Sequence, residues 1–107
     1  MGIATINPTT GETLKTFEAL SNLEIEEKLK LAQSSFERYR KTSFTQRSEW
    51  MNKAAQILED RQEEFGKIMT TEMGKTLKSA IAEAKKCALV CRYYAENAED
   101  FLKDMAV

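Results

Sequence analysis

One stripe of small apolar residues in the last third of the chain constrains its fold more than any other feature. Its members recur at alternating spacings of four and three residues, which places them on one face of an α-helix. Alanine and cysteine fill the middle of the stripe, so a neighbouring backbone can approach closely. The pattern predicts a helix from about Thr76 to about Lys103, roughly 40 Å long at 1.5 Å per residue. The stripe consists of Leu77, Ile81, Ala84, Ala88, Cys91, Ala95, Ala98 and Leu102.

Two further helical stretches precede this helix, and each begins with a capping-box pattern. Ser21 and Glu24 open the first stretch, and Ser43 and Gln46 open the second. No apolar residue lies between Leu58 and Phe65, which indicates a bend near residues 60–63. Gly74 is suited to a C-terminal cap. The predicted apolar face of the first stretch is Ile25, Leu29, Ala32, Phe36 and Tyr39. That of the second is Trp50, Ala54, Ile57, Leu58, Phe65, Ile68 and Met69.

Two short β-forming runs stand at the N-terminus. The runs Ile3–Ile6 and Thr13–Phe17 flank a segment in which Pro8 presets a turn and Gly11 accommodates a positive φ. This order predicts a β-hairpin within residues 1–20. An isolated hairpin is marginally stable in water, so it either packs on another element or stays mobile. The expected fold class is mostly α, with this short hairpin followed by three to four amphipathic helices over residues 21–107, the last one long.

Composition argues against several classes of function. The 107 residues carry 16 Lys and Arg against 17 Asp and Glu, a net charge of −1, whereas nucleic-acid binders usually have a basic excess. No apolar run approaches the roughly 20 residues of a membrane span, and the N-terminus has no signal-peptide pattern. Two cysteines without such a signal fit the reducing cytoplasm. We therefore expect a cytoplasmic protein whose partners are neither nucleic acid nor membrane.

The side chains that could carry chemistry form no self-contained site. The chain has no histidine, which excludes imidazole-based acid–base catalysis and imidazole metal ligands. Cys87 and Cys91 share one side of a helix, but a metal would need two more ligands, so both are interpreted as small buried apolar residues. The four glycines form no phosphate-binding pattern. The sequence predicts no catalytic, cofactor-binding or metal-binding residue.

Two other patterns have a functional interpretation that is weaker than the structural one. Adjacent carboxylates such as Glu63 and Glu64 could act as an acid–base pair, but helix surfaces produce such pairs by chance. The run Arg92-Tyr93-Tyr94 combines a cation with aromatic rings. A single cluster of this kind is weak support for nucleic-acid binding.

Three motifs, in this order and spacing, together resemble one enzyme family. They are Ile6-Asn7-Pro8-Thr9-Thr10-Gly11-Glu12, Thr71-Glu72-Met73-Gly74-Lys75 and Arg92-Tyr93-Tyr94-Ala95-Glu96-Asn97-Ala98. The set is similar to the N-terminal segment of NAD(P)-dependent aldehyde dehydrogenases, from about Ile3 to Leu102. Within that family the chain most resembles bacterial succinate-semialdehyde dehydrogenases.

The resemblance implies a parent enzyme that oxidises an aldehyde, succinate semialdehyde above all, to the carboxylate. A thiolate attacks the aldehyde carbon, and NAD or NADP accepts the hydride. The family's nucleophile, general base and cofactor-binding residues lie downstream of the matched region, so this chain alone is expected to be inactive and to bind no cofactor. In the family, the matched piece of the α/β aldehyde dehydrogenase fold packs on the dinucleotide-binding domain, so the same packing is expected for residues 21–107. The implied partners are the remainder of the parent dehydrogenase and further copies in a homo-oligomer.

The resemblance also assigns two residues to the substrate entrance, Ala82 and Lys86. Their spacing of four places them on one side of the helix. A small residue leaves room for substrate, and an ammonium group attracts an anionic semialdehyde. The plainer alternative is that Lys85 and Lys86 are solvated helix lysines. For the chain as a whole, the alternative is a helical interaction module that self-associates through its alanine-rich stripe and has no enzymatic role.

Overall fold

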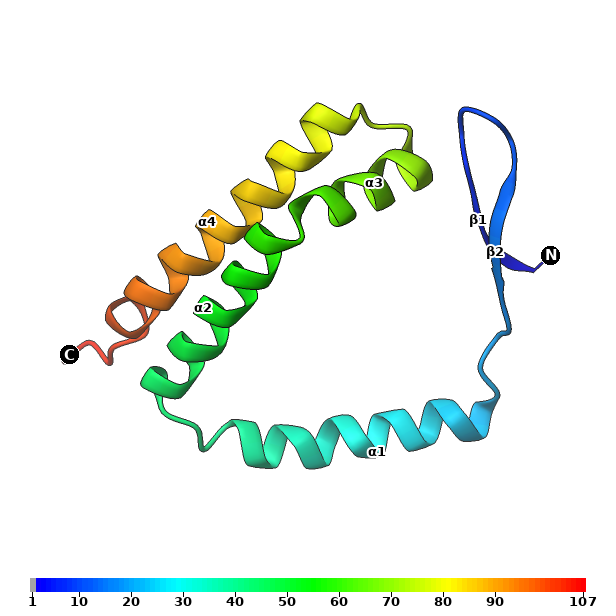
Figure 1. Ribbon diagram of the computed structural model, residues 1–107. Coiled ribbons are helices and arrows are strands. Elements are labelled where there is room, and N and C mark those ends of the chain that lie inside the picture. Colours follow the sequence, from blue (N-terminus) through cyan, green and yellow to red (C-terminus); the bar gives the residue numbers. More distant parts are fainter. Residues whose placement is uncertain (1) are drawn as a thin grey trace. The chain divides into compact units, whose positions relative to one another are not determined.

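The computed structural model describes residues 2–107 and shows a mostly helical chain with an N-terminal hairpin (Figure 1). The chain forms two compact units, the first ending at residue 42 and the second beginning at residue 43. The predicted fold class is confirmed. The elements are β1 (Ile3–Ile6), β2 (Thr13–Phe17), α1 (Asn22–Tyr39), α2 (Phe44–Asp60), α3 (Gln62–Met73) and α4 (Leu77–Phe101).

The hairpin of the first unit pairs β1 and β2 in antiparallel fashion. Ile3 lies opposite Phe17, and the register shifts by one residue next to Ile6. The turn is closed by the side chain of Asn7, whose Oδ1 accepts the backbone N–H of Thr9 at 2.9 Å. Gly11 has a φ of 74°, a conformation that favours glycine. The predicted hairpin is therefore confirmed, together with the role of its glycine.

Helix α1 has a well-formed N-terminus but no buried side chain. The hydroxyl of Ser21 accepts the backbone N–H of Glu24 at 3.3 Å, and the Glu24 carboxylate accepts the backbone N–H of Ser21 at 2.8 Å. These are the two bonds of the predicted capping box. Within the described residues, none of the apolar side chains of α1 is buried. Most helical stability in proteins comes from packing of an apolar face, and the apolar face of α1 is exposed in this unit.

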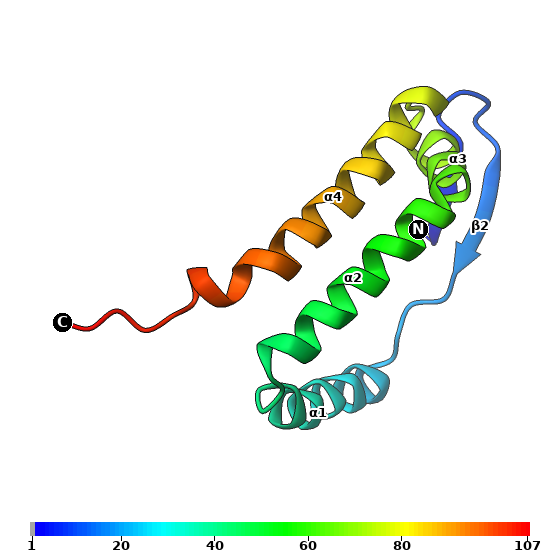
Figure 2. The same cartoon turned by 60° about the vertical axis from the view of Figure 1, so that its left-hand side comes forward.

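The second unit is a layer of three helices. Helices α2 and α3 follow one another with a break at Arg61, and α4 runs back along both of them (Figures 1 and 2). The break lies within residues 60–63, where the absence of apolar residues predicted a bend. Ser43 and Gln46 form the second capping box, and Gly74 ends α3 with a φ of 72°. Helix α4 matches the predicted long helix to within two residues at each end.

Only small residues are buried in this unit, which allows the helix axes to approach closely. The middle of the predicted stripe is confirmed, because Ala84 and Ala88 are buried. Its ends are not buried: the Leu77 and Leu102 side chains are 42% and 65% exposed. The buried residues are Ala55 of α2, Gly66 of α3, and Ala80, Ala84 and Ala88 of α4.

The predicted face of α2 is partly wrong. Trp50 and Ile57 are exposed, whereas Ala55 is fully buried. The prediction followed the helical spacing of apolar residues from Trp50, but the contact with α4 buries Ala55. The observed face of α2 is thus rotated by about one residue from the expected one.

A glycine fixes the closest approach between α3 and α4. A Cβ atom added to Gly66 would lie 2.7 Å from Ile81 Cγ1 and 3.2 Å from the Ile81 backbone nitrogen. Both separations are shorter than ordinary van der Waals contact. A side chain at position 66 would therefore require Ile81 to shift.

We predict that Ala88→Leu destabilises the unit by about 1–3 kcal/mol, because extra methylene groups in a close-packed contact force the helices apart. Urea denaturation followed by circular dichroism measures the effect. The matched control is Lys78→Ala on the exposed side of α4, which should stay within about 0.5 kcal/mol of the parent. Equal midpoint shifts for the two variants would show that the assignment of the buried face is wrong.

Candidate functional site

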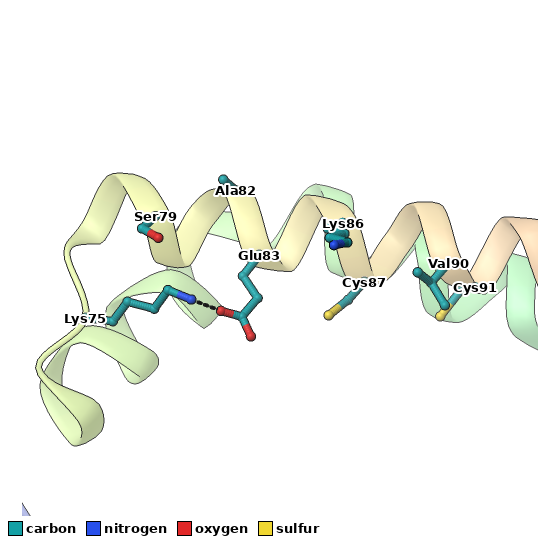
Figure 3. A pocket seen from close by; sticks show the side chains of 8 residues that line it. All are labelled: Lys75, Ser79, Ala82, Glu83, Lys86, Cys87, Val90 and Cys91. Atoms are coloured by element: carbon teal, nitrogen blue, oxygen red, sulfur yellow. Dashed lines mark hydrogen bonds and ion pairs between the residues drawn. The ribbon is translucent and has the colours of Figure 1, made fainter.

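An open groove of about 700 Å³ runs along α4 beside its packed face (Figure 3). Ala82 and Lys86, the two residues expected at a substrate entrance, both line it. They lie one helical turn apart, as their spacing predicted. The full lining is Lys75, Ser79, Ala82, Glu83, Lys86, Cys87, Val90 and Cys91.

Three charged side chains give the groove its electrostatic character. Lys75 precedes α4 and forms an ion pair with Glu83, drawn as a dashed line in Figure 3. Among residues 2–107, Lys86 has neither an ion pair nor a hydrogen bond. One cation of the groove is thus neutralised by its partner, and the other remains available to an anion.

The two cysteines differ in their surroundings. Both thiols are free; Cys91 is half-buried, but Cys87 is exposed on the groove (Figure 3). The interpretation of Cys87 as a buried apolar residue is therefore wrong, because its position turns it away from the contact with α2 and α3. Within the part of the chain that the structure describes, no three side chains of the metal-ligating types gather.

Arg92 ties α4 to α2. Its Nε and Nη2 atoms donate to the two carboxylate oxygens of Glu59 at 3.1 and 2.6 Å, and Nη2 also lies 3.3 Å from Gln56 Oε1. The hydrogen bonds from Arg92 lower the pKa of the Glu59 carboxyl, and the same contact raises the pKa of Arg92. The sequence marked Arg92 only as part of a motif. Its partner lies 33 positions away, which no local pattern reveals.

The structure shows which partners the side chains of the two weaker patterns have. Arg92 turns toward α2, whereas the neighbouring Tyr93 and Tyr94 rings are about half exposed and contact each other edge to face, 5.3 Å apart. The Arg92 guanidinium is therefore bonded to side chains of α2, while the two rings contact each other. The Glu64 carboxylate accepts hydrogen bonds from Arg61 at 2.5 and 2.8 Å, so one member of the Glu63–Glu64 pair is held in an ion pair.

None of the helices described among residues 2–107 is both long and apolar enough to cross a bilayer.

The chain matches a known protein family over its whole length. A family model described as "Aldehyde dehydrogenase family" matches residues 1–107, and the chain belongs to that family. The resemblance inferred from the three sequence motifs is thereby confirmed.

Curated relatives narrow the comparison. A probable succinate-semialdehyde dehydrogenase [NADP(+)] of Synechocystis sp. is 54% identical over 107 residues, which is all of this chain and 24% of that protein. The succinate-semialdehyde dehydrogenase [NADP(+)] of Mycobacterium leprae is 52% identical over 104 residues, or 97% of this chain and 23% of that protein. The chain therefore spans about a quarter of the length of these relatives.

Solved structures share the fold. Succinic semialdehyde dehydrogenase from Streptococcus pyogenes, crystallised with NADP+, is 30% identical with a TM-score of 0.91, over 98% of this chain and 23% of that one. Glyceraldehyde-3-phosphate dehydrogenase GapN from Methanocaldococcus jannaschii, complexed with NADP, is 25% identical with a TM-score of 0.88, over 98% and 23% of the two chains. The hairpin and the helical layer together are thus a recurrent part of this fold.

The Glu59–Arg92 pair generates a pH prediction. Because the pKa of Glu59 is lower in the folded protein than in the unfolded chain, the pair stabilises the fold above the ordinary glutamate pKa of about 4.3 and loses this effect as the pH falls below it. Glu59→Gln should lower the urea midpoint at pH 7, and the difference from the parent should shrink toward pH 3.

The control is Glu49→Gln, an exposed glutamate of the same helix that has no ion pair among residues 2–107. The urea midpoint of Glu49→Gln should differ little from that of the parent at both pH 7 and pH 3. A Glu59→Gln variant whose deficit stays constant with pH would indicate that the carboxylate charge contributes nothing.

Proposed function

We propose that this chain is the N-terminal segment of an NADP-dependent succinate-semialdehyde dehydrogenase. That enzyme oxidises succinate semialdehyde to succinate, and NADP+ accepts the electrons. The observation that carries the proposal is 52–54% identity, over nearly the whole chain, to proteins named for this activity. The interaction-module alternative is not favoured, since the family match extends over residues 1–107.

The residues of this segment do not fit a dinucleotide site. A pyrophosphate group is usually held where a glycine-rich turn opens a helix after a strand. Gly66 instead lies inside α3 against Ile81, and Gly74 ends that helix. We therefore assign the cofactor contacts to other parts of the enzyme and none to this segment.

In this proposal the groove on α4 forms part of the substrate entrance. Ala82 contributes a short side chain, which leaves the passage wide, and Lys86 contributes an unpaired ammonium group. Succinate semialdehyde carries a carboxylate at the end opposite its aldehyde. A positive charge at the entrance raises the association rate of such an anion.

The exposed apolar faces support a role as a covering layer. Helix α1 buries no side chain, and Trp50 and Ile57 of α2 are 44% and 50% exposed. We infer that residues 21–107 pack on the dinucleotide-binding domain of the enzyme, and that the assembled enzyme is a cytoplasmic homo-oligomer. Apolar patches beyond a few hundred Å² are typical of such contacts.

The test uses the full-length enzyme that carries this segment. Lys86→Glu should lower kcat/KM for succinate semialdehyde about tenfold relative to a neutral aldehyde of similar length, since electrostatic steering alters association rates by about 10–10³-fold. Raising the salt concentration should shrink the difference, because mobile ions screen the interaction.

Lys85→Glu is the matched control, because Lys85 is exposed on the same turn but does not line the groove. It should leave the ratio of the two kcat/KM values near that of the parent. If Lys86→Glu lowers kcat/KM equally for both substrates, or if Lys85→Glu changes the ratio in the same way, Lys86 does not act at the entrance. Absence of any turnover of succinate semialdehyde by the parent enzyme would contradict the proposed function itself.

A further inference from the structure

The groove contains an acidic residue that could cancel its free cation. Glu83 lies three positions before Lys86, a spacing at which side chains on a helix reach each other. The other positions three or four residues from Lys86 are Ala82, Leu89 and Val90, none of which is charged. Glu83 is thus the one carboxylate within a turn of α4 that can pair with Lys86.

The structure shows Glu83 paired elsewhere. Its carboxylate binds the ammonium group of Lys75, eight positions earlier, while Lys86 stays without a partner among residues 2–107. Figure 3 shows the Glu83 side chain directed toward Lys75, with Lys86 on the next turn. The left-handed conformation of Gly74 ends α3 and begins the short connection from which Lys75 reaches α4.

We propose that Lys75 is a positioning residue that holds Glu83 and so keeps Lys86 free for an anionic substrate. The inference rests on the proposed function and adds Lys75 and Glu83 to the charged residues of the entrance. With the pair intact, the groove carries one unbalanced positive charge. Without the Lys75 charge, Glu83 pairs with Lys86 and the groove becomes neutral.

Cys87 supplies a reporter that does not depend on catalysis. It lies one turn after Glu83 and lines the same groove with an exposed thiol. Iodoacetate and iodoacetamide both react with the thiolate, so the ratio of their rates cancels the thiolate fraction. The ratio then measures how strongly the groove favours an anion over a neutral molecule.

The experiment compares four full-length enzymes: the parent, Lys75→Met, Glu83→Gln and the double variant. Peptide mass spectrometry measures the reaction rates at Cys87. Lys75→Met should lower the ratio of the iodoacetate rate to the iodoacetamide rate about twofold, the effect of one unit of charge about 10 Å away in a largely aqueous groove. The preference for succinate semialdehyde over a neutral aldehyde should fall in parallel.

The double variant distinguishes positioning from a structural role. Removing the Glu83 charge in the Lys75→Met background leaves Lys86 unpaired again, so both ratios should return to the parent values. A merely structural ion pair would not be restored by deleting its second partner. Lys78→Met, an exposed lysine outside the groove, should leave both ratios unchanged.

The outcomes separate this inference from the proposed function. If Lys86→Glu lowers the substrate preference but Lys75→Met changes neither ratio, the positioning role is overturned and the entrance stands. If Lys75→Met lowers both ratios and the double variant does not recover, the pair is structural and the inference is again overturned. A Cys87 that reacts with neither reagent would show that the groove is covered in the full enzyme, which overturns the entrance and this inference and leaves the proposed activity standing.

Discussion

Contact between small residues is the constraint on which the second unit depends. Gly66 allows the backbone of α3 to meet α4 at Ile81, and the buried alanines continue this close approach along α4. A larger side chain at any of these points would force the axes apart. The groove follows from the same geometry: since Ala84 and Ala88 turn inward, the flanking row that includes Lys86 faces solvent.

Because the buried side chains are small, the second unit buries little apolar surface by itself. The described buried set contains no residue larger than alanine, while Trp50, Ile57 and Leu89 are between 44% and 67% exposed. Single exposed apolar residues are ordinary, but a helical layer that exposes its large apolar residues and buries its small ones is typical of a surface that contacts another part of a protein. This property of the layer supports its proposed place against another domain of a dehydrogenase, where its outer faces would become core.

The sequence predicted the elements well and their faces less well. Capping boxes at Ser21 and Ser43 and the C-terminal glycine at position 74 are local features, so they located the helix ends without knowledge of any neighbour. The face of α2 was misjudged because burial of Ala55 depends on how close α4 comes, which local periodicity does not contain. The groove likewise has one feature that local sequence predicts and one that depends on packing. The helical repeat was enough to bring Ala82 and Lys86 together, but the pairing of Lys75 with Glu83 depends on how the α3–α4 connection folds back.

The central claim, that close approach at Gly66 sets the packing of α3 on α4, is tested most directly by the unfolding free energy of Gly66→Ala, alone and combined with Ile81→Ala. In an unconstrained helix the substitution to alanine stabilises by about 1 kcal/mol. Here the added Cβ meets Ile81, so we expect Gly66→Ala to destabilise by about 1–3 kcal/mol. In the Ile81→Ala background, where the side-chain contact is gone, the same substitution should cost less. A Gly66→Ala variant more stable than the parent would contradict the account.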